Sequence, residues 1–145
     1  MKQILIRDPG SHSAETFNHL SRRAVGEQGL IEPGLHKTFG AGKFAVASYE
    51  IRVVSRKKGD AVSQLIRDNT REGWEAANIW HLLQTAVPLR GKKLPLVAFP
   101  SNIEKEPEKF PVLSEKGYRR QLVSWDRSTL LDHPEAYFLF VRKTY

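Results

Sequence analysis

The sequence predicts an α+β domain in which a small, mostly antiparallel sheet is packed on one face by two helices and carries a long proline-rich excursion. Three observations indicate this class: a long strand pattern over 43–55, a helix-length segment over 60–72 and an aromatic strand pattern over 136–142. Because the two strand patterns stand far apart in the chain, the sheet must close around everything between them. At 145 residues the chain has the length of one domain.

The N-terminal region predicts a strand, a helix and a loop. Gln3–Arg7 is a short apolar strand candidate that ends at the turn sequence Asp8-Pro9-Gly10. Ser13 is a good helix N-cap, and apolar residues then recur at spacings of three and four until Gly26 stops the pattern. Residues 30–42 are rich in glycine and proline without periodicity, so we expect a loop there.

The longest strand candidate is Lys43–Ser55. Its apolar and polar residues alternate, with a change of phase near Ala47-Ser48 that indicates a bulge. After a polar turn, Asp60 is placed to cap a helix that begins at Ala61. We expect this helix to end at Gly73, because glycine readily takes the left-handed conformation that terminates helices.

Trp74–Leu83 satisfies neither the helical nor the strand period cleanly. Since Gly73 is a strong helix stop, we expect a strand. A large ring directly after a helix stop is usually a core residue, so Trp74 is expected to cover the end of the helix and the sheet.

Five of the eight prolines fall within residues 88–111. Proline disfavours helix interiors and central strands, so this stretch predicts an extended excursion, with Leu94–Phe99 as an edge strand and 104–109 as an exposed tip. Gln121–Trp125 is a further strand candidate, and Ser128–Leu131 is expected to form a single helical turn.

These elements predict one domain over residues 1–145, with no internal repeat and no separable linker. Its parts are an N-terminal extension (1–42), a core (43–83 and 134–145) and a proline-rich insertion (84–133). The insertion is expected to wrap the edge of the sheet or to serve as a docking arm.

Three segments carry a resemblance to a known family. They are Tyr49-Glu50-x-x-Val53-Val54, Glu72-Gly73-Trp74-Glu75 and the closing strand Tyr137–Lys143. Together they resemble the bacterial family called domain of unknown function 4177, over about 40 residues in two pieces. The resemblance implies a strand, a helix ending in Gly-Trp-Glu and an aromatic closing strand. It implies no catalytic residues, and the extension and the insertion depart from it.

Composition excludes several classes of function. The chain has no cysteine, which excludes disulfides, thiolate metal sites and cysteine nucleophiles. No window is long and apolar enough to span a membrane or to form a signal peptide, so we expect a cytoplasmic protein without a membrane partner. Gly40-Ala41-Gly42-Lys43 lacks the Ser or Thr that binds magnesium in a phosphate loop, and the histidines lack metal-ligand spacing. We therefore expect no cofactor.

The formal net charge of +7 favours an acidic partner, either nucleic acid or an acidic protein surface. Basic residues stand in short clusters, including Arg22-Arg23 and Arg142-Lys143, rather than in one block. The candidate contacts are Arg56, Lys57, Lys58, Arg90, Lys92, Lys93, Arg119 and Arg120. Aromatic residues that could stack on bases lie near these clusters: Trp80, Trp125, Tyr118, Tyr137 and Tyr145.

The favoured interpretation is a non-enzymatic binding or adaptor module. One alternative is an accessory or inhibitory subunit of a larger complex, of phage or mobile-element origin, whose long arm orders on its partner. A second is a metal-independent phosphodiesterase or nuclease, because His19-Leu20-Ser21 and His36-Lys37-Thr38 resemble the paired His-x-Ser/Thr elements of two-histidine phosphoesterases.

Overall fold

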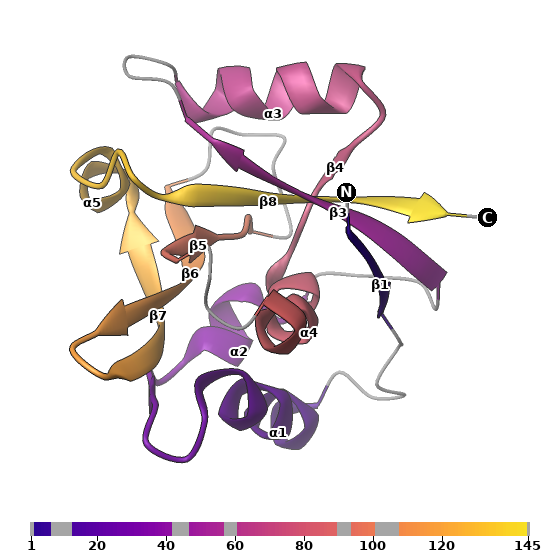
Figure 1. Cartoon of the computed structure of the whole chain (residues 1–145). Coiled ribbons are helices and arrows are strands. Elements are labelled where there is room, and N and C mark those ends of the chain that lie inside the picture. Colours follow the sequence, from indigo (N-terminus) through magenta and orange to yellow (C-terminus); the bar gives the residue numbers. More distant parts are fainter. Residues whose placement is uncertain are drawn as a thin grey trace.

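The computed structural model describes residues 2–6, 13–41, 47–56, 61–89, 94–100 and 108–144. Its helices are α1 (Ala14–Val25), α2 (Leu35–Phe39), α3 (Val62–Arg71), α4 (Ile79–Leu89) and α5 (Arg127–Leu131). Its strands are β1 (Lys2–Ile6), β2 (Leu30–Ile31), β3 (Ala47–Ser55), β4 (Glu75–Ala76), β5 (Leu96–Val97), β6 (Lys109–Lys116), β7 (Arg119–Asp126) and β8 (Tyr137–Thr144). The predicted α+β class is confirmed (Figure 1).

The strands form one mixed sheet, which is larger than the small, mostly antiparallel sheet that the sequence predicts. Its order is β1-β3-β8-β5-β6-β7-β2, with β4 paired to β8 beside this path. Two pairings are parallel, β5 with β8 and β2 with β7, and the others described are antiparallel. The closing strand β8 lies centrally, because β3 covers one of its edges and β5 and β4 share the other.

The helices cover both faces of the sheet, whereas packing on one face was predicted. Helices α1, α2 and α4 lie on one side, and α3 lies on the other (Figure 1). Strand β3 explains this arrangement, because its apolar residues point both ways. Tyr49 and Ile51 join the cluster that contains α4, and Val54 joins the cluster that contains α3. A sheet with two apolar faces must be covered on both.

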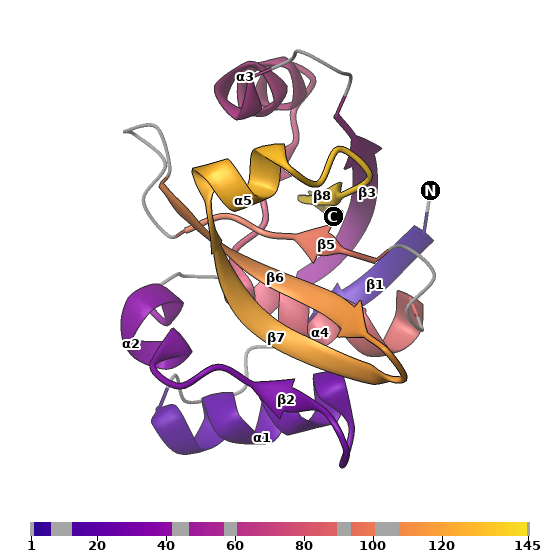
Figure 2. The ribbon, with the colours of Figure 1, turned by 90° about the vertical axis from the view of Figure 1, so that its left-hand side faces the viewer.

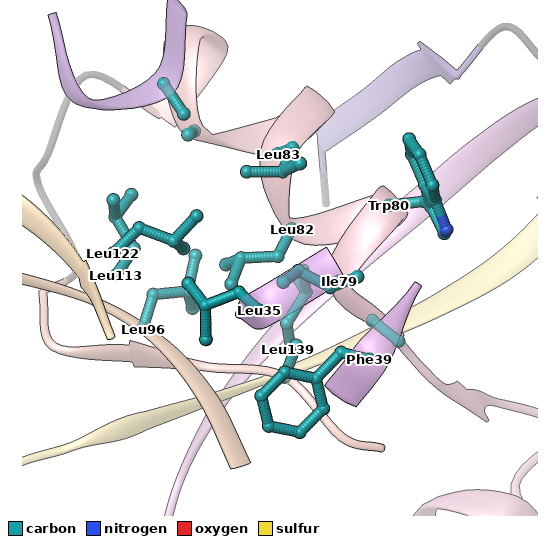
Figure 3. Close-up of a cluster of buried hydrophobic side chains, with 14 of the residues drawn as sticks. Leu35, Phe39, Ile79, Trp80, Leu82, Leu83, Leu96, Leu113, Leu122 and Leu139 are labelled. Atoms are coloured by element: carbon teal, nitrogen blue, oxygen red, sulfur yellow. The ribbon is translucent and has the colours of Figure 1, made fainter. Parts of the chain in front are cut away.

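The first core cluster fills the space between α4 and the sheet (Figure 3). Ile79, Leu82 and Leu83 project from α4 toward leucines of β5, β6, β7 and β8. Leu35 and Phe39 of α2 also belong to this cluster, as does Phe17 of α1.

The second core cluster joins α3 to the other face of the sheet. Trp74 is buried there with Phe138 and Phe140 of β8 and with Phe99 and Phe110. The prediction that Trp74 is a core residue at the end of this helix and the sheet is thereby confirmed.

In the N-terminal half, the predicted strand and helix are confirmed and the predicted loop is wrong in part. Ser13 caps α1 by accepting a hydrogen bond from the Thr16 N–H, and Gly26 ends the helix. The segment expected to be a loop contains β2 and α2. These elements are too short, at two and five residues, for periodicity to reveal them.

The region from β3 to α3 follows the prediction with one correction. The β3 ladder pairs without interruption through Ala47 and Ser48, so the predicted bulge is absent from the described residues. The predicted start of this strand at 43–46 and the residue Asp60 lie outside the described residues. The predicted start of the helix at Ala61 is one residue early, because Ala61 is the N-cap and α3 begins at Val62. Gly73 has φ +91°, which confirms its role at the end of α3.

The strand predicted over Trp74–Leu83 is wrong. Only Glu75–Ala76 pairs in the sheet, and α4 begins at Ile79. The Asn78 side-chain oxygen accepts hydrogen bonds from the Trp80 and His81 N–H groups (2.9 and 3.3 Å), so it caps the start of α4. The window spans a strand, a cap and a helix, which is why neither period fitted.

The proline-rich insertion contributes strands to the middle of the sheet, and the predicted edge strand is internal. β5 lies between β8 and β6, and β6 contains Pro111. The Pro111 carbonyl accepts a hydrogen bond from the Ala98 N–H (3.0 Å). In an antiparallel pair, the N–H and C=O of one residue point toward the same neighbouring strand. The carbonyl of Pro111 points toward β5, so the N–H that proline lacks would also point there, and no hydrogen bond to β7 is lost.

The later elements of the insertion match their predictions. Gln121–Trp125 lies within β7, and Ser128–Leu131 lies within α5. Most of the predicted exposed tip, residues 104–107, lies outside the described residues.

Candidate anion-binding groove

A groove of about 460 Å³ lies where the end of α1 meets the turn between β6 and β7. Three arginines line it, Arg23 from α1 and Arg119 and Arg120 from β7, together with the aromatic Tyr118. Figure 2 shows the β6–β7 turn beside the α1–β2 connection. Two basic clusters that stand far apart in the sequence thus meet in space.

The end of α1 is held by Arg22, which leaves Arg23 for the groove. The Arg22 guanidinium donates to the carbonyl oxygens of Gly26 (3.0 Å), Glu27 (3.4 Å) and Gly29 (2.7 Å). These bonds fold the chain back after the helix, with Gly26 at φ +83°. Both arginines are exposed, but Arg22 has a structural role because its guanidinium is bound to these carbonyls.

The β6–β7 hairpin presents Tyr118 to solvent. Lys116 pairs with Arg119, so the connection is the two-residue loop Gly117-Tyr118. Gly117 has φ +66°, as two-residue hairpin loops require. The Tyr118 side chain has 106% of its reference accessibility, so its ring rests on no other described residue.

Arg120 joins the hairpin to α1. Its guanidinium donates to the Ala24 carbonyl (3.2 Å), one of the last carbonyls of the helix, and its side chain is half-buried. Arg119, the preceding residue, is exposed. Within the described part of the chain, neither Arg23 nor Arg119 forms an ion pair.

The groove is therefore positively charged. Glu115 is the one acidic residue among its lining residues, and it lies opposite Arg120 in the β6–β7 ladder. Three guanidinium groups against one carboxylate leave an excess of positive charge at the surface, where arginine binds phosphate or carboxylate groups through paired hydrogen bonds.

Of the eight predicted contact residues, the structure brings two together. Arg119 and Arg120 line the groove. The predicted contacts Lys57, Lys58, Arg90, Lys92 and Lys93 lie outside the described residues. Arg56 is half-buried after the end of β3.

Arg56, one of the predicted contacts, does not lie beside the basic cluster Arg142-Lys143 of β8. β3 and β8 are antiparallel, so Ser55 pairs with Tyr137 while Tyr49 pairs with Lys143. Arg56 therefore lies at the opposite end of the ladder from Arg142 and Lys143, about 20 Å away at the usual rise per strand residue.

Most of the other candidate aromatic residues serve the core. Trp80 is buried, and its indole N–H donates to the Gly40 carbonyl (3.1 Å). Trp125 stacks on His133 with ring centres 4.4 Å apart, and Tyr137 packs against the first core cluster. Tyr145 lies outside the described residues, so Tyr118 is the candidate that the structure places in solvent.

The two histidines of the phosphoesterase alternative have different environments. His19 is exposed on α1, whereas Ser21 of the same motif is buried, because residues two apart on a helix point in nearly opposite directions. His36 packs against the rings of Phe17 and Trp80, with ring centres 5.3 and 6.2 Å away. A second groove, of about 540 Å³, is lined by Asn18, Glu32, His36 and Lys37 among others, and His19 is not part of its lining.

The buried histidine His81 has a strongly altered pKa. Burial lowers its pKa to about 4, because desolvation penalises the charged ring. Its Nδ1 atom accepts a hydrogen bond from the Asn78 N–H (3.0 Å), which the neutral ring can do. Its place beside Tyr49, with ring centres 5.3 Å apart, is in the core.

The charge pattern alone did not single out the groove. The sequence Lys116-Gly117-Tyr118-Arg119 between two strand-like runs is a signal for a two-residue hairpin, and it could have predicted the exposure of Tyr118. No local signal links Arg23 to this hairpin.

The described residues contain no cluster of three His, Asp or Glu side chains able to hold a metal ion. Among them, no helix is long and apolar enough to span a membrane. Comparisons of the chain with family models, curated proteins and solved structures return no match.

Proposed function

We propose that this protein is a non-enzymatic binding or adaptor module that recognises an acidic partner through the groove between α1 and the β6–β7 hairpin. The observation that carries the proposal is the convergence of Arg23 with Arg119 and Arg120 around an exposed tyrosine. Arg119 and Arg120 belong to the contact residues that the charge pattern suggests.

One arginine of the groove is held in place, and the other two are exposed. Arg120 is held by its bond to the Ala24 carbonyl, which fixes the hairpin against α1. Arg23 and Arg119 are exposed, so their guanidinium groups can turn toward a bound anion. The net charge of +7 attracts such a partner from a distance and raises its association rate.

The proposal is tested by binding of labelled polyanions at two salt concentrations. The probes are a single-stranded oligonucleotide, the matching duplex and polyglutamate. The variant is the double substitution Arg23→Gln with Arg119→Gln, which removes the two exposed arginines of the groove. For nucleic acid, log affinity falls as log salt rises, and we expect the magnitude of this slope to decrease by about 1.5 when two phosphate contacts are lost.

A matched control removes the same charge elsewhere. The double substitution Arg67→Gln with Arg71→Gln alters α3, on the opposite side of the sheet from α1, and both side chains are exposed. We expect it to retain most of the affinity. If no polyanion binds the native protein, or if the control loses as much affinity as the groove variant, the groove is not the binding site.

A further inference from the structure

We infer that the partner recognised by the groove is a single strand of nucleic acid, with one unpaired base stacked on Tyr118 and its phosphates on Arg119 and Arg23. This inference rests on the proposed function and names the chemistry of its partner. Its starting point is the position of Tyr118 at the tip of the hairpin, next to the arginines.

The ring of Tyr118 has no structural role in the described residues. It is fully exposed. By comparison, the other large hydrophobic residues exposed in the described part of the chain, Leu30 and Leu131, are 50% and 54% exposed, so about half of their surface is covered. The turn itself needs only Gly117, whose φ is positive. A ring whose two faces are both exposed to water is able to stack on a planar partner.

The neighbouring residues favour nucleic acid over an acidic protein. The acidic side chains of a polypeptide supply carboxylates for the arginines but present no aromatic face to the ring. A single strand supplies both, since base stacking on aromatic side chains and arginine contacts to phosphates are the usual features of single-strand binding. Gln28, also in the groove lining, offers both a donor and an acceptor to base edges.

The same geometry disfavours a duplex. The faces of paired bases are covered by their neighbours, so a ring at the tip of a hairpin reaches only the backbone or the groove edges of a duplex. An unpaired base can leave the strand and meet the ring. We therefore expect tighter binding to a single strand than to the matching duplex at equal salt.

The discriminating experiment compares Tyr118→Ala and Tyr118→Trp on a single-stranded oligonucleotide, its duplex and polyglutamate. We expect Tyr118→Ala to weaken single-strand binding by about 5- to 150-fold, the range that loss of one stacked base corresponds to. Tyr118→Trp should restore the affinity, and single-strand binding should quench the fluorescence of the introduced indole. Polyglutamate binding should not respond to Tyr118→Ala.

The outcomes separate this inference from the proposed function. If all three probes bind through the arginines and Tyr118→Ala has no effect, the inference is overturned and the proposed function stands. If polyglutamate binds more tightly than the single strand, the partner is an acidic protein. If no probe binds, both fail. Leu131→Ala, which trims an exposed side chain on α5, serves as the control for loss of exposed apolar surface.

Discussion

The guanidinium carbon of Arg142 lies 4.3 Å from the centre of the Trp74 ring. A second guanidinium, from Arg52, lies 4.7 Å from the same ring, and Trp74 itself is 1% exposed. Arg142 also pairs with Glu50 (3.0 Å), and Arg52 pairs with Glu72 at the end of α3. Charges on β3 and β8 therefore cover the outer side of the ring and join α3 to the sheet.

Replacing Trp74 should destabilise the protein strongly. Trp74→Ala removes the largest side chain of the second core cluster and both cation–π contacts, so we expect the free energy of unfolding to fall by about 3–5 kcal/mol. Chemical denaturation measures this loss. Trp125→Ala, at a half-buried ring, provides the comparison, and an equal or larger loss there would contradict the central role of Trp74.

Stability should fall as the pH drops below 6.5. Burial lowers the pKa of His81 to about 4, so between these values the unfolded chain binds a proton that the folded chain excludes. The contribution of His81 is complete above pH 6.5 and is lost progressively toward pH 4, by about 3 kcal/mol in all. Denaturation at several pH values between 7.5 and 5 measures the part of this loss that occurs above pH 5.

Two variants test whether His81 causes this pH dependence of stability. His81→Gln should flatten the decline of unfolding free energy between pH 6.5 and 5. His19→Gln, which removes an exposed imidazole on α1, should leave the decline as it is in the native protein. A native protein whose stability is level across this interval would show that His81 is not buried in the neutral form.

The hairpin turn should depend on Gly117. Its φ of +66° is strained for any residue with a Cβ, although a Cβ there would meet no atom within 4 Å. We expect Gly117→Ala to cost about 1–2 kcal/mol of stability through backbone strain alone. Tyr118→Ala, at the next position, should change stability by less than about 0.5 kcal/mol because the ring contacts nothing. Equal losses for the two variants would be inconsistent with this turn.

The two groove arginines of β7 should differ in their effect on folding. Arg120→Gln removes the hydrogen bond to the Ala24 carbonyl, so we expect a loss of about 1 kcal/mol. Arg119→Gln should leave stability unchanged and reduce polyanion affinity. Parallel denaturation and binding measurements separate these roles, and the assignment is wrong if Arg119→Gln proves the more destabilising variant.

Local signals in the sequence determined the elements that depend on neighbouring residues. Ser13 caps α1 through an atom three residues away, and Gly73 ends α3 through its own backbone conformation. The alternation of apolar and polar residues predicted β3, and the run of aromatic and aliphatic residues over 136–142 predicted β8. The burial of Trp74 followed from its place after the helix stop. The positive charge and its arrangement in short clusters are likewise properties of the chain itself.

Tertiary packing decided how these elements are arranged. The prolines around β5 and β6 predicted an excursion at the edge of the sheet, yet both strands lie inside it. The sheet tolerates the single proline of β6 because its backbone faces the end of the two-residue strand β5. The groove has the same origin: Arg120 reaches Ala24 across 96 positions. Such contacts form because the folded chain must bury apolar surface on both sides of its sheet. The residues within a few positions of Arg23 or Arg119 therefore do not predict which distant segment will lie beside them.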